Sequence, residues 1–178
     1  MNNYYCEGQI IGRLVHFCSR DAMDIRGMSE ETIKAIRNNI FEDGVSKIEE
    51  VCDLYSLKNY KEELLKIDRF GETKVNNLLV AIENSKTQPL NRVIYGLSIP
   101  QIGKTASKKI ADVYNNIHEI KEYGNSITLS KLLGNSVGDS FCDNFLMNSN
   151  INNIINSLSI AGLTMTQPQE NNLSNKLE

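Results

Sequence analysis

Apolar residues recur along most of this chain at the three- and four-residue spacing of an α-helix. The clearest stripes are Ile10, Ile11, Leu14 and Phe17 or Cys18 in one segment, and Val75, Leu78, Leu79 and Ile82 in another. No segment shows the sustained alternation of apolar and polar residues, bounded by turn signals, that is typical of a strand. The pattern therefore predicts an all-α protein of about a dozen short helices and no sheet.

The two ends of the chain carry little apolar pattern. Residues 164–178 contain almost nothing to bury, so we expect them to form a flexible linker. Residues 1–5 are expected to be loose as well. The ordered core is accordingly predicted to run from about residue 8 to residue 163.

One short sequence motif occurs four times, at residues 25–36, 67–79, 99–110 and 135–145. In each copy an apolar residue stands between two turn residues, and a helical pattern follows. These triplets are Gly27-Met28-Ser29, Arg69-Phe70-Gly71, Gln101-Ile102-Gly103 and Ser136-Val137-Gly138. The third positions lie 42, 32 and 35 residues apart, which indicates a repeated supersecondary unit. The four copies are hairpins 1 to 4 in chain order.

Each copy predicts a turn between two short helices. The middle apolar side chain is expected to point back into the core, while a glycine in the turn tolerates positive φ and lets another backbone come close. The amides of the turn and of the following first helical turn then point outward together. Because these N–H groups have no partner within the helix and lie at its positive end, they suit phosphate. An array of such sites suits a nucleic acid backbone and carries little sequence preference.

The distribution of charge favours the middle hairpins as phosphate sites. Net charge is −3, which argues weakly against a polyanionic partner, yet residues 66–109 hold eight Lys or Arg and only three Asp or Glu. Hairpin 3 is the strongest candidate, with Lys104, Thr105, Lys108 and Lys109 around its turn, and hairpin 2 follows with Arg69, Thr73 and Lys74. Hairpin 4 has no cation nearer than Lys131. Scattered, solvated charges are the alternative interpretation.

The segment "CEGQIIGRLVHFCSRDAMDIRGMSEETI" (6–33) resembles the region of bacterial NAD-dependent DNA ligases that joins a small zinc finger to a helix-hairpin-helix domain. The matching residues are Gly12, His16, Phe17, Ser19, Arg20, Ala22, Met23, Ile25 and Gly27. Similarity continues through "FGETKVNNLLVAIENSK", "LNRVIYGLSIPQIGKTASKKIA" and "IINSLSIAGL", and so covers about residues 6–163.

This resemblance implies four helix-hairpin-helix motifs, paired two by two in one compact helical domain at residues 8–163. In that family the domain grips duplex DNA around a nick through the minor groove, and a BRCT domain would begin after residue 178. Catalysis belongs to an adenylation domain, which carries a K-x-D-G lysine, and to an NMN-binding domain, and the parent ligase uses NAD and Mg. The nearest match here is Lys66 in "KIDR", with arginine in place of glycine. We therefore expect no catalytic residue, and expect this segment to hold duplex or nicked DNA beside the other domains of a parent ligase.

The residues expected to contact DNA come from the four turns and from one polar helix face at spacings of three and four. They are Arg13, His16, Arg20, Gly27, Ser29, Arg69, Gly71, Thr73, Lys74, Gln101, Gly103, Lys104, Thr105, Lys108 and Gly138.

The resemblance makes Cys6 the last ligand of a zinc finger, with residues 1–7 as its remnant. Zinc needs a closed set of four ligands, so one cysteine should bind no metal and this segment should hold no cofactor. Cys18 and Cys52 stand in apolar stretches and are predicted to pack in the core. A disulfide framework is not expected without a secretion signal.

Two other interpretations remain open at this stage. The chain could be a freestanding helix-hairpin-helix module of another repair or recombination protein. It could also be a protein-interaction scaffold, which its acidity and the degenerate hairpins 1 and 4 would suit. No apolar run is long enough to span a bilayer and no signal pattern opens the chain, so a cytoplasmic location without a membrane partner is expected.

Overall fold

The structure is a computed structural model that describes residues 6–42, 45–46 and 48–168. In chain order its elements are α1 (Glu7–Cys18), α2 (Glu30–Asn39), β1 (Phe41–Glu42), β2 (Val45–Ser46), the 3₁₀ helix η1 (Val51–Tyr60), α3 (Lys61–Lys66), α4 (Glu72–Ser85), α5 (Leu90–Gly96), α6 (Lys104–Val113), α7 (Ile117–Tyr123), α8 (Ser126–Leu133), α9 (Asn135–Phe141), the π-helical segment η2 (Cys142–Leu146) and α10 (Ser149–Ala161). The prediction of an all-α protein built from short helices is confirmed.

The prediction of no sheet is wrong in one small respect. Strands β1 and β2 form a two-residue antiparallel ladder that pairs Phe41 with Ser46 and Glu42 with Val45. Two residues are too few to produce a detectable alternation of apolar and polar positions, so the sequence gives no signal for this ladder.

Several helices begin at a side chain that caps their free amides. Asn116, Asn125 and Asn148 each accept a hydrogen bond from a main-chain N–H in the first turn of α7, α8 and α10. Helix α10 ends at Ala161 and is followed by Gly162, whose φ of +99° is the left-handed conformation that commonly terminates a helix. Capping residues of this kind stabilise the ends of short helices, and the chain can therefore turn many times within a small domain.

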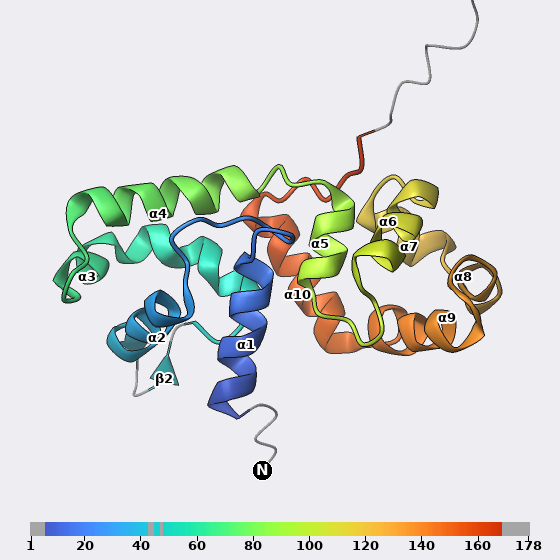
Figure 1. The fold of residues 1–178 in the computed structure, drawn as a ribbon, viewed down its shortest axis with the longest axis horizontal. Coiled ribbons are helices and arrows are strands. Elements are labelled where there is room, and N and C mark those ends of the chain that lie inside the picture. The colour runs from blue at the N-terminus through green and yellow to red at the C-terminus, as the bar shows by residue number, and fades with distance from the viewer. Residues whose placement is uncertain (1–5, 43–44, 47, 169–178) are drawn as a thin grey trace, which may run out of the picture.

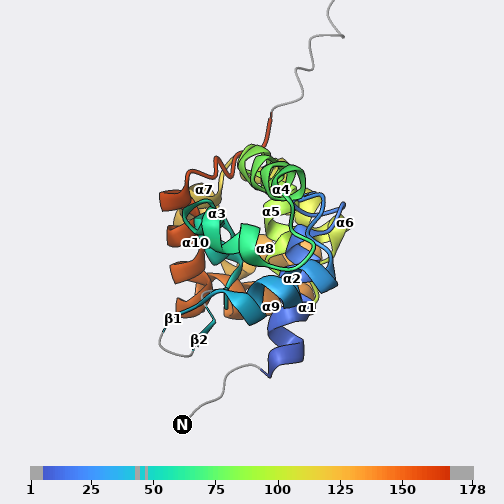
Figure 2. The ribbon, with the colours of Figure 1, turned by 90° about the vertical axis from the view of Figure 1, so that its left-hand side faces the viewer.

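The helices gather in three groups along the long axis of the molecule (Figure 1). Helices α2, α3 and α4 lie at one end, α1, α5 and α10 in the middle, and α6 to α9 at the other end. Figure 2 looks at the first of these groups end-on, with α3 and α4 in front of the rest. Hairpins 1 and 2 therefore belong to one end of the molecule, and hairpins 3 and 4 to the other.

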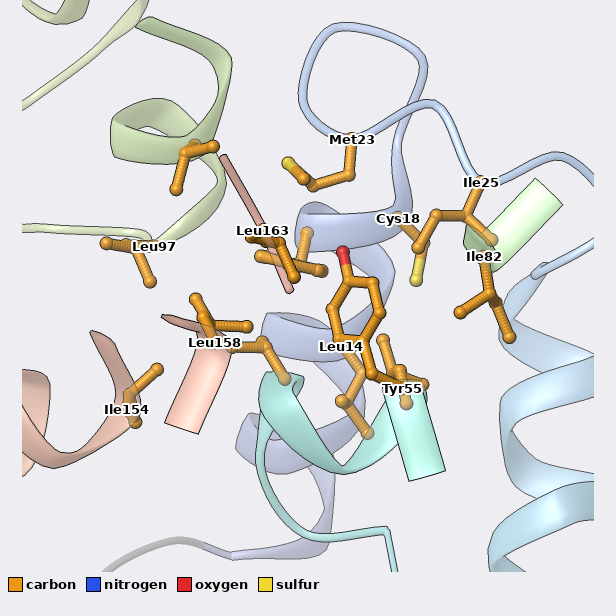
Figure 3. Packing of buried hydrophobic residues seen from close by; sticks show 14 of the residues in the cluster. Leu14, Cys18, Met23, Ile25, Tyr55, Ile82, Leu97, Ile154, Leu158 and Leu163 are labelled. Atoms are coloured by element: carbon orange, nitrogen blue, oxygen red, sulfur yellow. The ribbon is translucent and has the colours of Figure 1, made fainter. Parts of the chain in front are cut away.

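One apolar cluster of the described residues joins the first and last helices. Helix α1 packs against α2, α5 and η1, and α10 packs against η1 and η2. Figure 3 shows Leu158 and Leu163, from the end of the chain, near Leu14 of α1 and the ring of Tyr55. The buried Tyr55 hydroxyl lies 2.8 Å from Ser85 Oγ, so its polar end is paired inside the core.

The predicted flexible linker does not begin at residue 164. Met165 is only 1% exposed, and its carbonyl accepts a hydrogen bond from Ile117 N at 3.2 Å. Leu90 N donates to Thr166 O at 2.9 Å, which satisfies one of the free amides at the start of α5. Residues 164–168 are thus tied to the body, and a lone methionine among polar residues gives no periodic signal of this. Residues 1–5 and 169–178, also predicted to be loose, lie outside the described residues.

Candidate nucleic-acid interface

Hairpins 1, 2 and 3 share one turn geometry. In each, the amide of the middle apolar residue donates to the carbonyl three residues earlier, with N–O distances of 3.3, 3.1 and 3.0 Å. The acceptors are the buried residues Ile25, Ile67 and Ile99, and the donors are Met28, Phe70 and Ile102, each 5% exposed. The prediction that the middle side chain fixes the turn to the core is confirmed for these three hairpins.

The residue before the middle one has positive φ in all three turns. The values are +88° at Gly27, +65° at Arg69 and +66° at Gln101. Positive φ is uncommon away from glycine and costs an arginine or glutamine about 1 kcal/mol. Hairpins 2 and 3 therefore keep the same turn as hairpin 1 at a cost in backbone energy, and gain a long polar side chain on its outer surface.

The helices of hairpins 2 and 3 begin at glycines that leave the first amides uncapped. Gly71 and Gly103 are the N-cap residues of α4 and α6, and neither helix has a side-chain cap among the described residues. Both glycines have negative φ in the β region, which any residue can adopt, and a Cβ added to either would meet no atom within 4 Å. The fold itself thus has no steric need for glycine at these positions. In hairpin 1, by contrast, Ser29 Oγ accepts from Thr32 N at 3.2 Å and fills one of the free amides.

We expect that Gly103→Ser will raise stability and lower affinity for duplex DNA. A serine at the N-cap accepts from the amides of the first turn and adds a few tenths of a kcal/mol to the free energy of unfolding. The same hydroxyl then competes with phosphate for those amides, so duplex binding should weaken several-fold. Urea denaturation and fluorescence anisotropy on a labelled duplex measure the two effects.

Ser29→Gly is the matched control, because it opens the capped amide of hairpin 1. It should lower stability slightly and leave duplex affinity unchanged or raised. If Gly103→Ser bound duplex as tightly as the unsubstituted chain, the amides of α6 would not be a phosphate site.

Exposed cations stand around hairpins 2 and 3. The first turn of α6 contains Lys104 and no acidic residue, and Thr105, Lys108 and Lys109 are exposed. In hairpin 2, the Arg69 side chain is 90% exposed, and Lys74 Nζ lies 3.9 Å from the centroid of the Phe70 ring. Thr73 is also exposed, and two acidic residues offset the cations of this turn: Asp68, which lies 3.8 Å from Arg69 Nε, and Glu72. Hairpin 3 is consequently the more positive of the two.

The turn of hairpin 1 lies against helix α4 of hairpin 2. A groove of about 770 Å³ separates them, lined by Arg26 and Gly27 on one side and by Thr73, Lys74 and Asn77 on the other. A Cβ added to Gly27 would lie 3.8 Å from Leu78 Cδ1, an ordinary contact. Three of the predicted contact residues of hairpins 1 and 2, namely Gly27, Thr73 and Lys74, therefore line one shared groove.

Hairpin 4 does not have the predicted register. The turn between α8 and α9 is at Gly134, which has φ of +93°, whereas Gly138 lies buried inside α9. The Gly138 amide donates to Gly134 O at 2.8 Å, and a Cβ there would come within 2.6 Å of the Ser130 backbone. The close packing of α8 on α9 leaves no room for a side chain at residue 138, which explains the glycine there. Because its amide is already bonded to Gly134 O, Gly138 offers no free amide to a ligand. A packing glycine and a turn glycine look alike in one sequence.

Arg13, His16 and Arg20 do not share one helix face. Helix α1 ends at Cys18, so Arg20 lies beyond it in the connector that leads to hairpin 1. Arg13 Nη2 pairs with Glu50 Oε2 at 3.0 Å, and His16 Nε2 donates to the carbonyl of Tyr95 at 2.8 Å. Arg13 and His16 therefore fasten α1 to its neighbours, and among the three only Arg20 is exposed.

The connector of residues 19–24 is bound to hairpin 3 by Lys104, which the sequence analysis expected to contact DNA, and by Arg92, which it did not include among the contact residues. Arg92 Nη1 donates to the carbonyls of Arg20 at 2.8 Å and Ala22 at 3.1 Å. Lys104 Nζ lies 2.5 Å from Asp21 Oδ2. The hydrogen bond from Lys104 lowers the pKa of the Asp21 carboxyl, and its charge with those of Arg92 and Arg20 adds to the effect. The only indication of Arg92 in the sequence was its position within residues 66–109, the segment rich in Lys and Arg.

The cysteines do not assemble a metal site in the part of the chain that the structure describes. Cys6 is exposed at the start of α1, and no group of three or more His, Cys, Asp or Glu side chains comes together there. A single thiolate does not fit a tetrahedral zinc ion. Cys18 is buried, and burial raises the pKa of its thiol to about 12, as expected for a core residue. Over these same residues, the structure contains no helix with the length and apolar content to span a membrane.

Comparison with known proteins places relatives of this chain among bacterial DNA ligases. No family model matches the chain. A DNA ligase of Aquifex aeolicus is 45% identical over 131 residues, which are 74% of this chain and 16% of the ligase. Ligases of Alkaliphilus oremlandii (39% identity, 68% of this chain, 17% of the ligase) and Clostridium tetani (36%, 76% and 20%) are similar to it as well. The chain is thus homologous to a segment of bacterial DNA ligases and spans a fifth or less of these relatives' length.

Proposed function

We propose that this chain binds the phosphate backbone of duplex DNA without reading its sequence, as the DNA-holding segment of a DNA ligase. One observation carries the proposal. The turns of hairpins 2 and 3 are built alike, and each ends in an uncapped helix N-terminus beside exposed cations. Because the chain is homologous to a segment of DNA ligases, we expect the polyanion that binds at these turns to be DNA.

In this proposal the main chain and the side chains divide the work. Amides at Gly71 and Gly103 donate to phosphate oxygens, which the positive end of each helix also attracts. Arg69, Lys74 and Lys104 add charge-assisted contacts. Phosphate contacts of this kind fix the position of a protein on DNA and carry no sequence information, which suits an enzyme that must act anywhere on a genome.

The finer assignment rests on the resemblance found in the sequence. We assign residues 8–163 to the helix-hairpin-helix domain of an NAD-dependent ligase, which seals nicks in replication and repair. Adenylation, with NAD and Mg, would belong to other domains of the parent enzyme, and Cys6 would complete a zinc finger with three cysteines from outside this segment. This chain alone would hold nicked or intact duplex and would not join it.

A salt titration tests the proposal directly. We expect log affinity for a labelled 20-base-pair duplex to fall linearly with log salt, with a slope of about −3 to −5, because each neutralised phosphate contributes about −0.9. Duplexes of unrelated sequence should bind within two-fold of each other. An affinity that did not change between low and moderate salt would contradict phosphate binding and favour a protein-interaction scaffold.

A further inference from the structure

The connector between α1 and hairpin 1 places one carboxylate among three cations. Asp21 Oδ2 lies 2.5 Å from Lys104 Nζ, and their side chains are 57% and 59% exposed. Arg92 from α5 donates to the carbonyls on both sides of Asp21, those of Arg20 and Ala22. Positive charge from the connector, from α5 and from α6 therefore converges on a single acidic side chain at the surface.

The charges in this cluster do not balance. One carboxylate faces the ammonium of Lys104 and the guanidinium groups of Arg92 and Arg20, whose combined field favours its ionised form. A phosphate diester carries the same charge as a carboxylate and offers comparable oxygens to these donors. The cluster thus has the composition of a phosphate site that already holds an anion of its own.

We propose that Arg20, Arg92 and Lys104 form a phosphate-binding site in which Asp21 is the resident anion, displaced when a DNA phosphate enters. This inference rests on the proposed function and extends it, because it continues the DNA surface from the turn of hairpin 3 onto the connector. It also predicts that Asp21 weakens DNA binding, since its contact with Lys104 must be broken first.

The ion pair is not needed to hold the connector in place. Arg92 already bonds two connector carbonyls, and Gln88 Nε2 donates to a third, that of Met23, at 3.2 Å. An exposed ion pair such as Asp21 with Lys104 contributes little to stability in comparison. Competition with phosphate is therefore the larger consequence of Asp21.

Asp21→Asn tests the inference with Asp112→Asn as its control. Asp112 is exposed on α6, the same helix as Lys104, and each of the two variants raises the net charge by one unit. We expect Asp21→Asn to bind duplex about five-fold more tightly at low salt, and Asp112→Asn to change affinity less than two-fold. Equal effects of the two variants, or weaker binding by Asp21→Asn, would overturn the inference.

A second measurement isolates the competition for Lys104. Lys104→Gln should cost more affinity in the Asp21→Asn background than in the unsubstituted chain, where Asp21 already neutralises part of its charge. Equal costs would again overturn the inference, and Asp21→Ser replaces Asp21→Asn if the amide variant does not fold. If the unsubstituted chain failed to bind duplex in dilute buffer, the proposed function would fail with it; if it bound and Asp21→Asn behaved like Asp112→Asn, only the inference about Asp21 would fail.

Discussion

Reversing two charges, in Arg69→Glu with Lys104→Glu, is expected to weaken duplex binding about 100-fold at low salt. Each side chain lies beside an uncapped helix N-terminus, one in hairpin 2 and one in hairpin 3. Losing a charge-assisted hydrogen bond to phosphate costs about 1.5 kcal/mol, and two separate sites should add. Anisotropy titrations of each single variant and of the pair would show whether the losses combine in this way.

The control for this result is Lys58→Glu with Lys61→Glu. Both lysines are exposed where η1 meets α3, and the double change alters net charge by the same amount. It should reduce affinity by no more than a few-fold, through long-range repulsion alone. Arg69 is 90% exposed and the Lys104 ion pair lies at the surface, so the hairpin variant should also keep its melting temperature. Equal losses in the two double variants would mean that DNA senses overall charge and not the hairpins.

Hairpins 1 to 3 could be predicted from the sequence because their apolar residues mark the turn. Met28, Phe70 and Ile102 are buried at equivalent places, and burial of a large side chain strongly constrains which residue can stand there. Because glycine adopts positive φ readily, Gly27 itself predicts the conformation of its turn. Arg69 and Gln101 have the same backbone conformation without a glycine, so only the alignment of the copies could suggest it.

The contacts between segments could not be predicted in the same way. The hydrogen bonds from Arg92 to the connector join residues about 70 positions apart, and no local pattern records such a pairing. The spacing of Arg13 and His16 places them on one face of a helix. It does not indicate whether DNA or the rest of the protein covers that face. Their partners Glu50 and Tyr95 are 37 and 79 positions away in the sequence, and only the packing of the chain brings them to α1.

Gly138 shows how a repeat read from the sequence can assign a wrong role to a residue, and stability measurements separate the two roles. A turn glycine that faces DNA should tolerate alanine in the absence of DNA, whereas Gly138→Ala forces a Cβ to within 2.6 Å of the Ser130 backbone. Backbone cannot move aside as a flexible side chain can, so α8 and α9 must separate. We expect the free energy of unfolding to fall by about 2 kcal/mol, even after the gain of about 1 kcal/mol from replacing glycine within a helix.

Gly12→Ala is the matched control, and its effect should have the opposite sign. Gly12 is exposed within α1, and an added Cβ meets no atom within 4 Å, so alanine should raise stability by about 1 kcal/mol. Urea denaturation with equal m-values would establish both changes as changes in stability. Below the unfolding transition, Gly138→Ala should bind duplex as the unsubstituted chain does. Loss of binding without loss of stability would return Gly138 to the DNA surface and contradict the close packing of α8 on α9.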